Sequence, residues 1–155
     1  MTTTTIHNRF DPAKNVDSIA FRQDRVLQSA ELNELQAGFA HRLRGLGDAL
    51  FKNGDVLRGA RIIVNPTTGD TMAEDGAIWL AGALRGVPPA SLAVPVVGVV
   101  HVGVYLQSRL VTELEDPTLL NPAAGTPSYQ EPGAARYVID PVWGVAGDGK
   151  SGDFY

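Results

Sequence analysis

The sequence predicts an α+β fold that is mostly β: an extended N-terminal arm, one long helix, and then an antiparallel β-sandwich or small barrel domain. Only three of the 17 glycines and one of the ten prolines come before Gly54, and the other 14 glycines and nine prolines lie in residues 54–155. Because glycine and proline break helices and mark turns, this shift places a helical segment before a turn-rich β segment. We expect a docking arm at 1–28, a helix at 29–53, a β domain at 54–145, and a flexible Gly- and Asp-rich tail at 146–155 from which further domains could follow.

The segment 29–52 has the apolar spacing of a helix. Its large apolar residues recur at intervals of 3, 4, 4, 3 and 4, and they repeat after 11 residues. On a helix they occupy an arc of about 80°, narrower than the stripe of most core helices, which favours a seam between helices of a bundle. An ordinary core helix is the alternative. Ser29 is expected to cap the helix, and Gly45 and Gly47 to bend or remove its last turn. The expected oligomer interface consists of six residues: Leu32, Leu35, Phe39, Leu43, Leu46 and Leu50.

The arm is too apolar to remain surrounded by water, although Thr2–Thr5 are expected to be disordered. Its apolar residues have no helical period, and Pro12 interrupts the start. Such an arm lies either on its own domain or on another chain, and the second interpretation makes it a docking element. The docking residues would be Ile6, Phe10, Val16, Ile19, Phe21, Val26 and Leu27.

Beyond the helix, short apolar runs separated by turn residues predict strands. The longest run alternates apolar and polar or small residues, and Pro95 makes another run an edge strand because proline cannot donate to a ladder. The Asn65–Asp70 segment reads as a proline-initiated turn, and Pro117–Pro132 as a loop. The expected strands are Ala60–Asn65, Ala77–Leu80, Leu92–Val97, Val99–Glu113 and Tyr137–Ile139.

One segment matches the phosphate-binding loop pattern G-x-x-x-x-G-K-[ST], namely Gly144–Ser151. That chemistry needs a helix directly after the Lys-Ser pair, whose N-terminus faces the phosphates. Only four residues follow here, and Pro141 is expected to break the preceding strand. We therefore expect a flexible loop that binds no nucleotide.

Other chemistry-bearing residues form no convincing site. The chain has no cysteine, and His7, His41 and His101 fall on an arm, a helix and a strand without metal-ligand spacing. Glu113 and Glu115 would point to one side of a strand, but nothing apolar beside them would raise a pKa for acid–base work. We expect no catalytic, cofactor-binding or metal-binding residue, and no enzyme.

Charge and hydropathy exclude two classes of partner. The net charge of −4 and the absence of a basic run speak against nucleic-acid binding. The most apolar stretch, Leu92–Val104, is too short and too interrupted to span a bilayer, so no membrane partner is expected.

Several segments resemble proteins of tailed-phage and prophage tail fibres and baseplates. The arm-to-helix junction, Phe21-x4-Val26-Leu27-Gln28-x2-Glu31-Leu32-Asn33-Glu34-Leu35-Gln36, is similar to the opening of such proteins. The wider frame, over residues 6–145, resembles one uncharacterised domain family among them. The matching segments are Asn8–Pro12, Gly47–Phe51, Arg85–Pro89, Thr112–Pro117 and Tyr129–Ala134.

The resemblance implies a virion structural protein that attaches a tail fibre or spike to the baseplate as an oligomeric adapter, expected to be a homotrimer. Its partners would be copies of itself and baseplate or fibre proteins, and it would reside in the virion after assembly in the bacterial cytoplasm. One alternative is a receptor- or glycan-binding module. A less favoured one is a fragment of a capsule-degrading enzyme. The aromatic residues available to a glycan site are Trp79, Tyr105, Tyr129, Tyr137 and Trp143.

Overall fold

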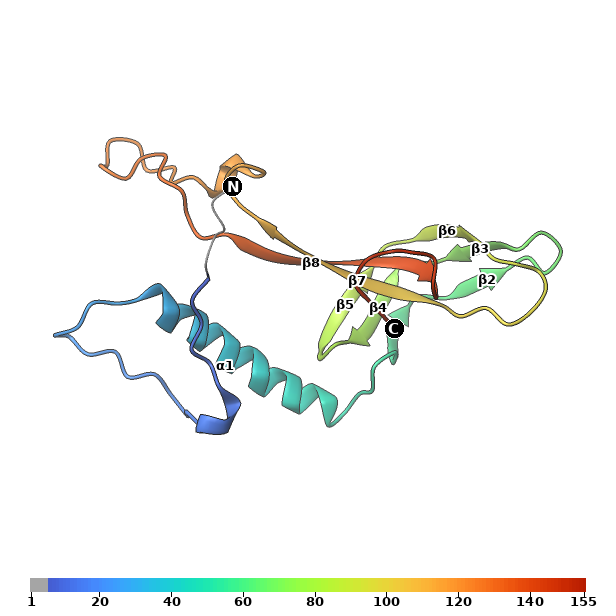
Figure 1. Ribbon diagram of the computed structural model, residues 1–155, viewed down its shortest axis with the longest axis horizontal. Helices are drawn as coiled ribbons and strands as arrows, with labels where there is room; N and C mark the ends of the chain where they lie inside the picture. Colours follow the sequence, from blue (N-terminus) through green and yellow to red (C-terminus); the bar gives the residue numbers. More distant parts are fainter. Residues whose placement is uncertain (1–5) are drawn as a thin grey trace. The chain divides into compact units, whose positions relative to one another are not determined.

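The computed structural model describes residues 6–155, so the expectation for Thr2–Thr5 lies outside the described residues. The chain divides into two compact units. The first runs to residue 53 and includes residues 81–83; the second comprises residues 54–80 and 84–155. The predicted class is confirmed: an N-terminal stretch precedes one helix, and three small antiparallel sheets follow it (Figure 1).

The helix α1 spans Ser29–Asp48. Its N-cap is Gln28, and the expectation that Ser29 caps it is wrong. Gln28 still has extended backbone, and its N–H donates to the carboxylate of Glu31 at 2.9 Å. The glutamate three residues after the cap therefore accepts the backbone N–H of Gln28, which has no partner within the helix.

The C-terminal end of α1 comes earlier than the predicted helix of 29–53. The helix ends at Asp48, directly after Gly47, and the carbonyl of Gly47 accepts the N–H of Leu50 at 2.9 Å. The last turn is thus absent, as the cost of Gly45 and Gly47 in a helix interior suggests. Leu50, one of the predicted interface residues, lies beyond the helix.

The first six strands form one three-stranded meander that is bent into two sheets. One sheet has the order β1-β4-β5 and the other β2-β3-β6, so the chain passes between the sheets at β1–β2, β3–β4 and β5–β6. The strands are β1 (Val56–Gly59), β2 (Ile62–Val64), β3 (Asp70–Ala73), β4 (Gly76–Leu80), β5 (Ala83–Val87) and β6 (Ala90–Ala93).

The strand expected over Ala60–Asn65 is β2, and the bend shortens it to Ile62–Val64. Ala60 has a φ of 55°, which interrupts the strand, and its N–H donates to the carbonyl of Asp75 at 2.8 Å. The backbone of Gly76 lies so close that a Cβ there would be 2.7 Å from the Cβ of Ala60. Two chain segments therefore cross in close contact at the bend, and a residue with a side chain at position 76 does not fit.

The turn between β2 and β3 forms as predicted. The N–H of Asn65 donates to the carbonyl of Asp70 at 2.8 Å, and the Asn65 side chain accepts the N–H of Thr67 at 2.9 Å. The strand expected over Leu92–Val97 is β6, an edge strand of its sheet that ends at Ala93, before Pro95.

The third sheet has the order β8-β7-β9. β7 (Val102–Val111) and β8 (Arg136–Val145) run side by side, with every one of their residues in the ladder (Figure 1). β8 is longer than the expected Tyr137–Ile139, and Pro141 does not break it. β8 is an edge strand, so one of its sides has no neighbouring strand. On that open side the missing N–H of a proline removes no hydrogen bond from the sheet.

The segment expected to be a flexible tail instead returns to the sheet. Its residues Asp153–Phe154 form β9, which pairs with Tyr105 and Leu106 of β7. The N–H of Tyr155 donates to the carbonyl of Val104 at 2.9 Å. Gly103 makes room for this strand, because a Cβ there would lie 2.7 Å from the Phe154 ring.

The buried core of the second unit is built from aromatic and aliphatic side chains of β3, β4, β5, β7 and β8. Trp143 of β8 is 4% exposed, and its indole N–H donates to the carbonyl of Pro88 at 2.8 Å. This bond ties the long ribbon of β7 and β8 to the link between β5 and β6. The larger members of the core are Ile78, Trp79, Leu80, Val87, Val104, Tyr105, Leu106, Val111 and Trp143.

Candidate assembly surface on the helix and arm

The apolar stripe predicted from the sequence is exposed on α1. The exposed fraction of these residues ranges from 44% at Leu32 to 70% at Phe39, and Leu50 beyond the helix is 69% exposed. The buried residues of α1 are only Ala30 and Gly47, neither of which belongs to the stripe. Within its own unit, the helix thus buries none of the large side chains that give it its periodicity. The stripe residues on α1 are Leu32, Leu35, Phe39, Leu43 and Leu46.

The arm covers a different face of the same helix. The Asn33 side chain donates to the carbonyl of His7 at 2.8 Å, and Arg9 lies 3.7 Å from Glu34 and 3.8 Å from Glu31. At about 100° per residue, these three helix positions lie about 80–140° around the axis from the centre of the stripe. The arm therefore leaves the stripe open.

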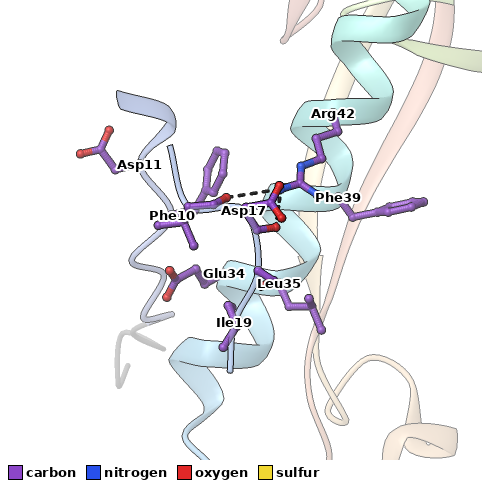
Figure 2. A pocket seen from close by; sticks show the side chains of 11 residues that line it. Phe10, Asp11, Asp17, Ile19, Glu34, Leu35, Phe39 and Arg42 are labelled. Carbon is purple, nitrogen blue, oxygen red and sulfur yellow. Dashed lines mark hydrogen bonds and ion pairs between the residues drawn. The ribbon is translucent and has the colours of Figure 1, made fainter. Parts of the chain in front are cut away.

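The second anchor of the arm is an arginine of the helix. Arg42 donates to the backbone carbonyl of Asp17 and lies 3.1 Å from the Asp17 carboxylate (Figure 2). The ring of Phe10 lies 5.4 Å from that of His41. Of the two interpretations of the arm, contact with its own unit thus holds for residues 7–19, and docking on another chain remains a prediction.

The next part of the arm, residues 20–27, is more exposed. Phe21 is 53% exposed and Val26 is 86% exposed, and Arg22 forms its ion pair inside the segment, with Asp24 at 3.0 Å. Of the seven predicted docking residues, Ile6 is 43% exposed at the start of the described chain, and the other six fall into two groups. Phe10, Val16 and Ile19 lie along the helix, and Phe21, Val26 and Leu27 lie in the exposed segment.

An apolar groove of about 150 Å³ runs between the arm and the helix (Figure 2). Phe10 and Ile19 line it from the arm, and Leu35, Gly38 and Phe39 line it from the helix. A Cβ on Gly38 would lie 3.7 Å from the Phe10 ring, an ordinary contact distance, so the ring lies directly over this position of the helix. The groove shares Leu35 and Phe39 with the exposed stripe, and the two surfaces are continuous.

Reasoning from the sequence missed the polar residues that hold the arm. Ion pairs join the arm to the helix, among them Arg9 with Glu34 and Asp17 with Arg42. The two members of each pair lie far apart in the sequence, at no distinctive spacing. The one available signal was the i, i+3 pair of Glu31 and Glu34 in the first turns of the helix, which presents two carboxylates to one cation.

The Gly144–Ser151 segment matching the phosphate-loop pattern forms a turn occupied by its own carboxylate. Asp148 accepts the N–H of Val145 at 3.0 Å and that of Lys150 at 3.1 Å, and its carboxylate pairs with the Lys150 ammonium. The hydrogen bond from Lys150, followed by that from Val145, lowers the pKa of Asp148 to about 2. The strand β9, and no helix, follows this turn. The groups that would hold a phosphate in a nucleotide-binding loop here hold Asp148.

The remaining candidate residues do not meet. Glu113 and Glu115 lie in a turn after β7, so their predicted placement on one side of a strand is wrong; the ladder ends at Val111. His101 is exposed and lies just before β7. Within residues 6–155, no three His, Asp or Glu side chains are grouped to hold a metal ion, and no helix is long and apolar enough to cross a membrane.

The aromatic residues offered for a glycan site mostly serve the core. Trp79, Tyr105 and Trp143 are each at least 94% buried, whereas Tyr129 and Tyr137 are exposed. Tyr105 also packs at 4.9 Å against Phe154, and its hydroxyl donates to the carbonyl of Val145 at 3.0 Å. The glycan-binding alternative therefore lacks three of its five aromatic residues at the surface.

The fold and this surface define a mostly β protein whose single helix has an arm on one face and an open apolar stripe beside it. The chain belongs to the family described as a domain of unknown function, DUF4815, which it matches over residues 5–155. No curated protein and no solved structure matches it.

Proposed function

We propose that this protein is a structural component of a phage tail, an oligomeric adapter that attaches a fibre or spike to the baseplate. In this role three copies associate through the stripe on α1, and baseplate or fibre proteins bind the assembled oligomer in the virion. The proposal combines the sequence resemblance to tail-fibre and baseplate proteins with the exposed surface of the helix.

The observation that carries the proposal is the exposure of the stripe. The exposed fractions of the six predicted interface residues add up to about three and a half whole side chains. At about 1.5–3 kcal/mol for each fully buried side chain, covering them supplies about 5–10 kcal/mol per chain. Patches of this kind on a protein surface mark sites of association. A second identical helix offers side chains with the same spacing.

The test is the mass of the protein in solution. We expect light scattering on a sizing column to give three chains per particle at tens of micromolar. Leu35→Asp should give smaller particles, because an unpaired carboxylate cannot be buried in an apolar seam without a cost of several kcal/mol.

Leu114→Asp is the matched control, because Leu114 is 87% exposed in the turn after β7 and outside the stripe. The control should leave the mass unchanged. A wild-type chain that runs as a monomer, or a Leu35→Asp variant that keeps the wild-type mass, would refute the seam.

A further inference from the structure

We infer that the arm belongs to the interface between copies: residues 17–19 of one copy, with the groove beside them, contact the α1 helix of a second copy. This inference rests on the proposed self-association through the stripe. It adds a role for the arm, which would clasp the neighbouring helix in addition to its own.

The first support is the area that the stripe offers. A side chain removed from water contributes about 60–120 Å² of apolar surface, so the stripe supplies about 200–400 Å² per copy. Specific interfaces bury about 800 Å² on each partner. The stripe alone falls short of this area, so surface beside it must be covered as well.

The second support is the continuity of the groove with the stripe. Leu35 and Phe39 belong to both, and the remaining apolar wall comes from Ile19 and Phe10 of the arm. A helix that covers Leu35 and Phe39 therefore lies over the open side of the groove. At about 150 Å³, the groove has the volume of an apolar cavity that holds a benzene ring, which is the size of one branched or aromatic side chain.

The third support is the direction of the groove. It lies on one flank of the stripe only, because the arm covers that side of α1. When identical helices run parallel around an axis, one flank of each helix faces the opposite flank of the next. On α1 that opposite flank includes Gln36, which is exposed and lies about 60° around the helix from the centre of the stripe, on the side away from the groove. The occupant of the groove is then the flank of the second copy that contains Gln36.

The chain lacks cysteine, so two single-cysteine chains test this contact directly. Ile19→Cys with an affinity tag and Gln36→Cys without a tag are co-expressed at full length, purified and oxidised. Each chain then has one cysteine only, so any disulfide that forms joins two chains. We expect the tag to retain a covalent pair of one tagged and one untagged chain, absent when either variant is expressed alone.

Ser18→Cys replaces Ile19→Cys if the latter does not fold, because Ser18 also lines the groove and is exposed. An oligomer that forms no mixed covalent pair with either arm cysteine overturns the inference and leaves the seam intact. A single-chain mass for both variants and for the wild type overturns the inference together with the seam.

Discussion

Gly38 and Gly45 lie seven residues apart on one side of α1, and replacing each by leucine separates the effect on the helix from the effect on the arm. A Cβ on Gly45 would meet no atom within 4 Å, whereas one on Gly38 would lie 3.7 Å from the Phe10 ring. Each replacement removes a glycine from the helix, which stabilises it by up to about 1 kcal/mol. Only the Gly38→Leu side chain must displace Phe10.

The magnitude follows from the burial of Phe10, which is partly exposed. Losing about half of a full side-chain burial costs about 1–1.5 kcal/mol, and this cost falls on the arm alone. The population of chains with the arm released should therefore rise about 5–10-fold. The helix gain offsets most of this loss in Gly38→Leu, which should unfold near the urea concentration of the wild type, whereas Gly45→Leu has the gain alone and should unfold at a somewhat higher one.

Limited trypsin digestion measures the released population, because cleavage follows the open form when opening is fast. Arg9 and Lys14 lie in the anchored part of the arm, and Arg22 and Arg25 lie in the exposed segment. We expect Gly38→Leu to speed cleavage after Arg9 and Lys14 about 5–10-fold relative to Gly45→Leu. Cleavage after Arg22 and Arg25 should be alike in both. Equal cleavage at all four sites would refute the idea that Phe10 holds the arm on the helix.

Two further predictions concern the second unit. The pKa of Asp148, about 2 against an ordinary 3.8, means that its carboxylate stabilises the fold above about pH 4 and that this contribution is lost as the pH falls toward 2. The melting temperature of Asp148→Asn should thus lie below wild type at neutral pH and converge with it near pH 2, and a gap independent of pH would contradict the assignment. Trp143→Phe removes the bond to Pro88 and part of the core volume, so urea unfolding should show a loss of about 1–3 kcal/mol. Tyr137→Phe, at a residue 73% exposed, should change stability by less than about 0.5 kcal/mol, and equal losses would contradict the role of Trp143.

The helix could be predicted because its information is local. The spacing of its apolar residues and the glycines near its end are read directly from the sequence, and α1 lies within the predicted range. The cap was misplaced because two neighbouring residues could start the helix, and the reach of Glu31 back to Gln28 decided between them.

The bend in the meander could not be predicted, since it depends on two distant segments. Ala60 has an ordinary side chain, and only the approach of Gly76 and the carbonyl of Asp75 places it in a left-handed conformation. Pro141 was misjudged for a related reason. A proline is tolerated in a strand at the edge of a sheet, and the position of β8 at an edge is a property of the whole sheet.

The exposed stripe of the candidate site could be predicted, but the arm contacts could not. Two of the arm's anchors are backbone carbonyls, those of His7 and Asp17, which any sequence supplies. The groove exists only because Phe10 and Ile19 meet Leu35 and Gly38 across at least 15 residues of intervening chain. Such contacts have no periodicity to detect.

The bend between the two sheets of the meander also bears on where this chain can change in length. Side chains alternate along a strand, so one inserted residue would turn every later side chain of that strand to the other face. At the bend, Gly59 and Ala60 cross Asp75 and Gly76 in close contact. This contact fixes the pairing register of the strands on both sides of the bend, so a shift of register in one sheet cannot be compensated in the other. The turn before β3 has a close approach of its own, because a Cβ on Gly69 would lie 2.0 Å from the backbone oxygen of Val94. The loop at 112–135 lies beyond the ends of β7 and β8 and outside their ladder. Homologous chains of different length should therefore differ in the loop at 112–135 and keep their spacing across the bend.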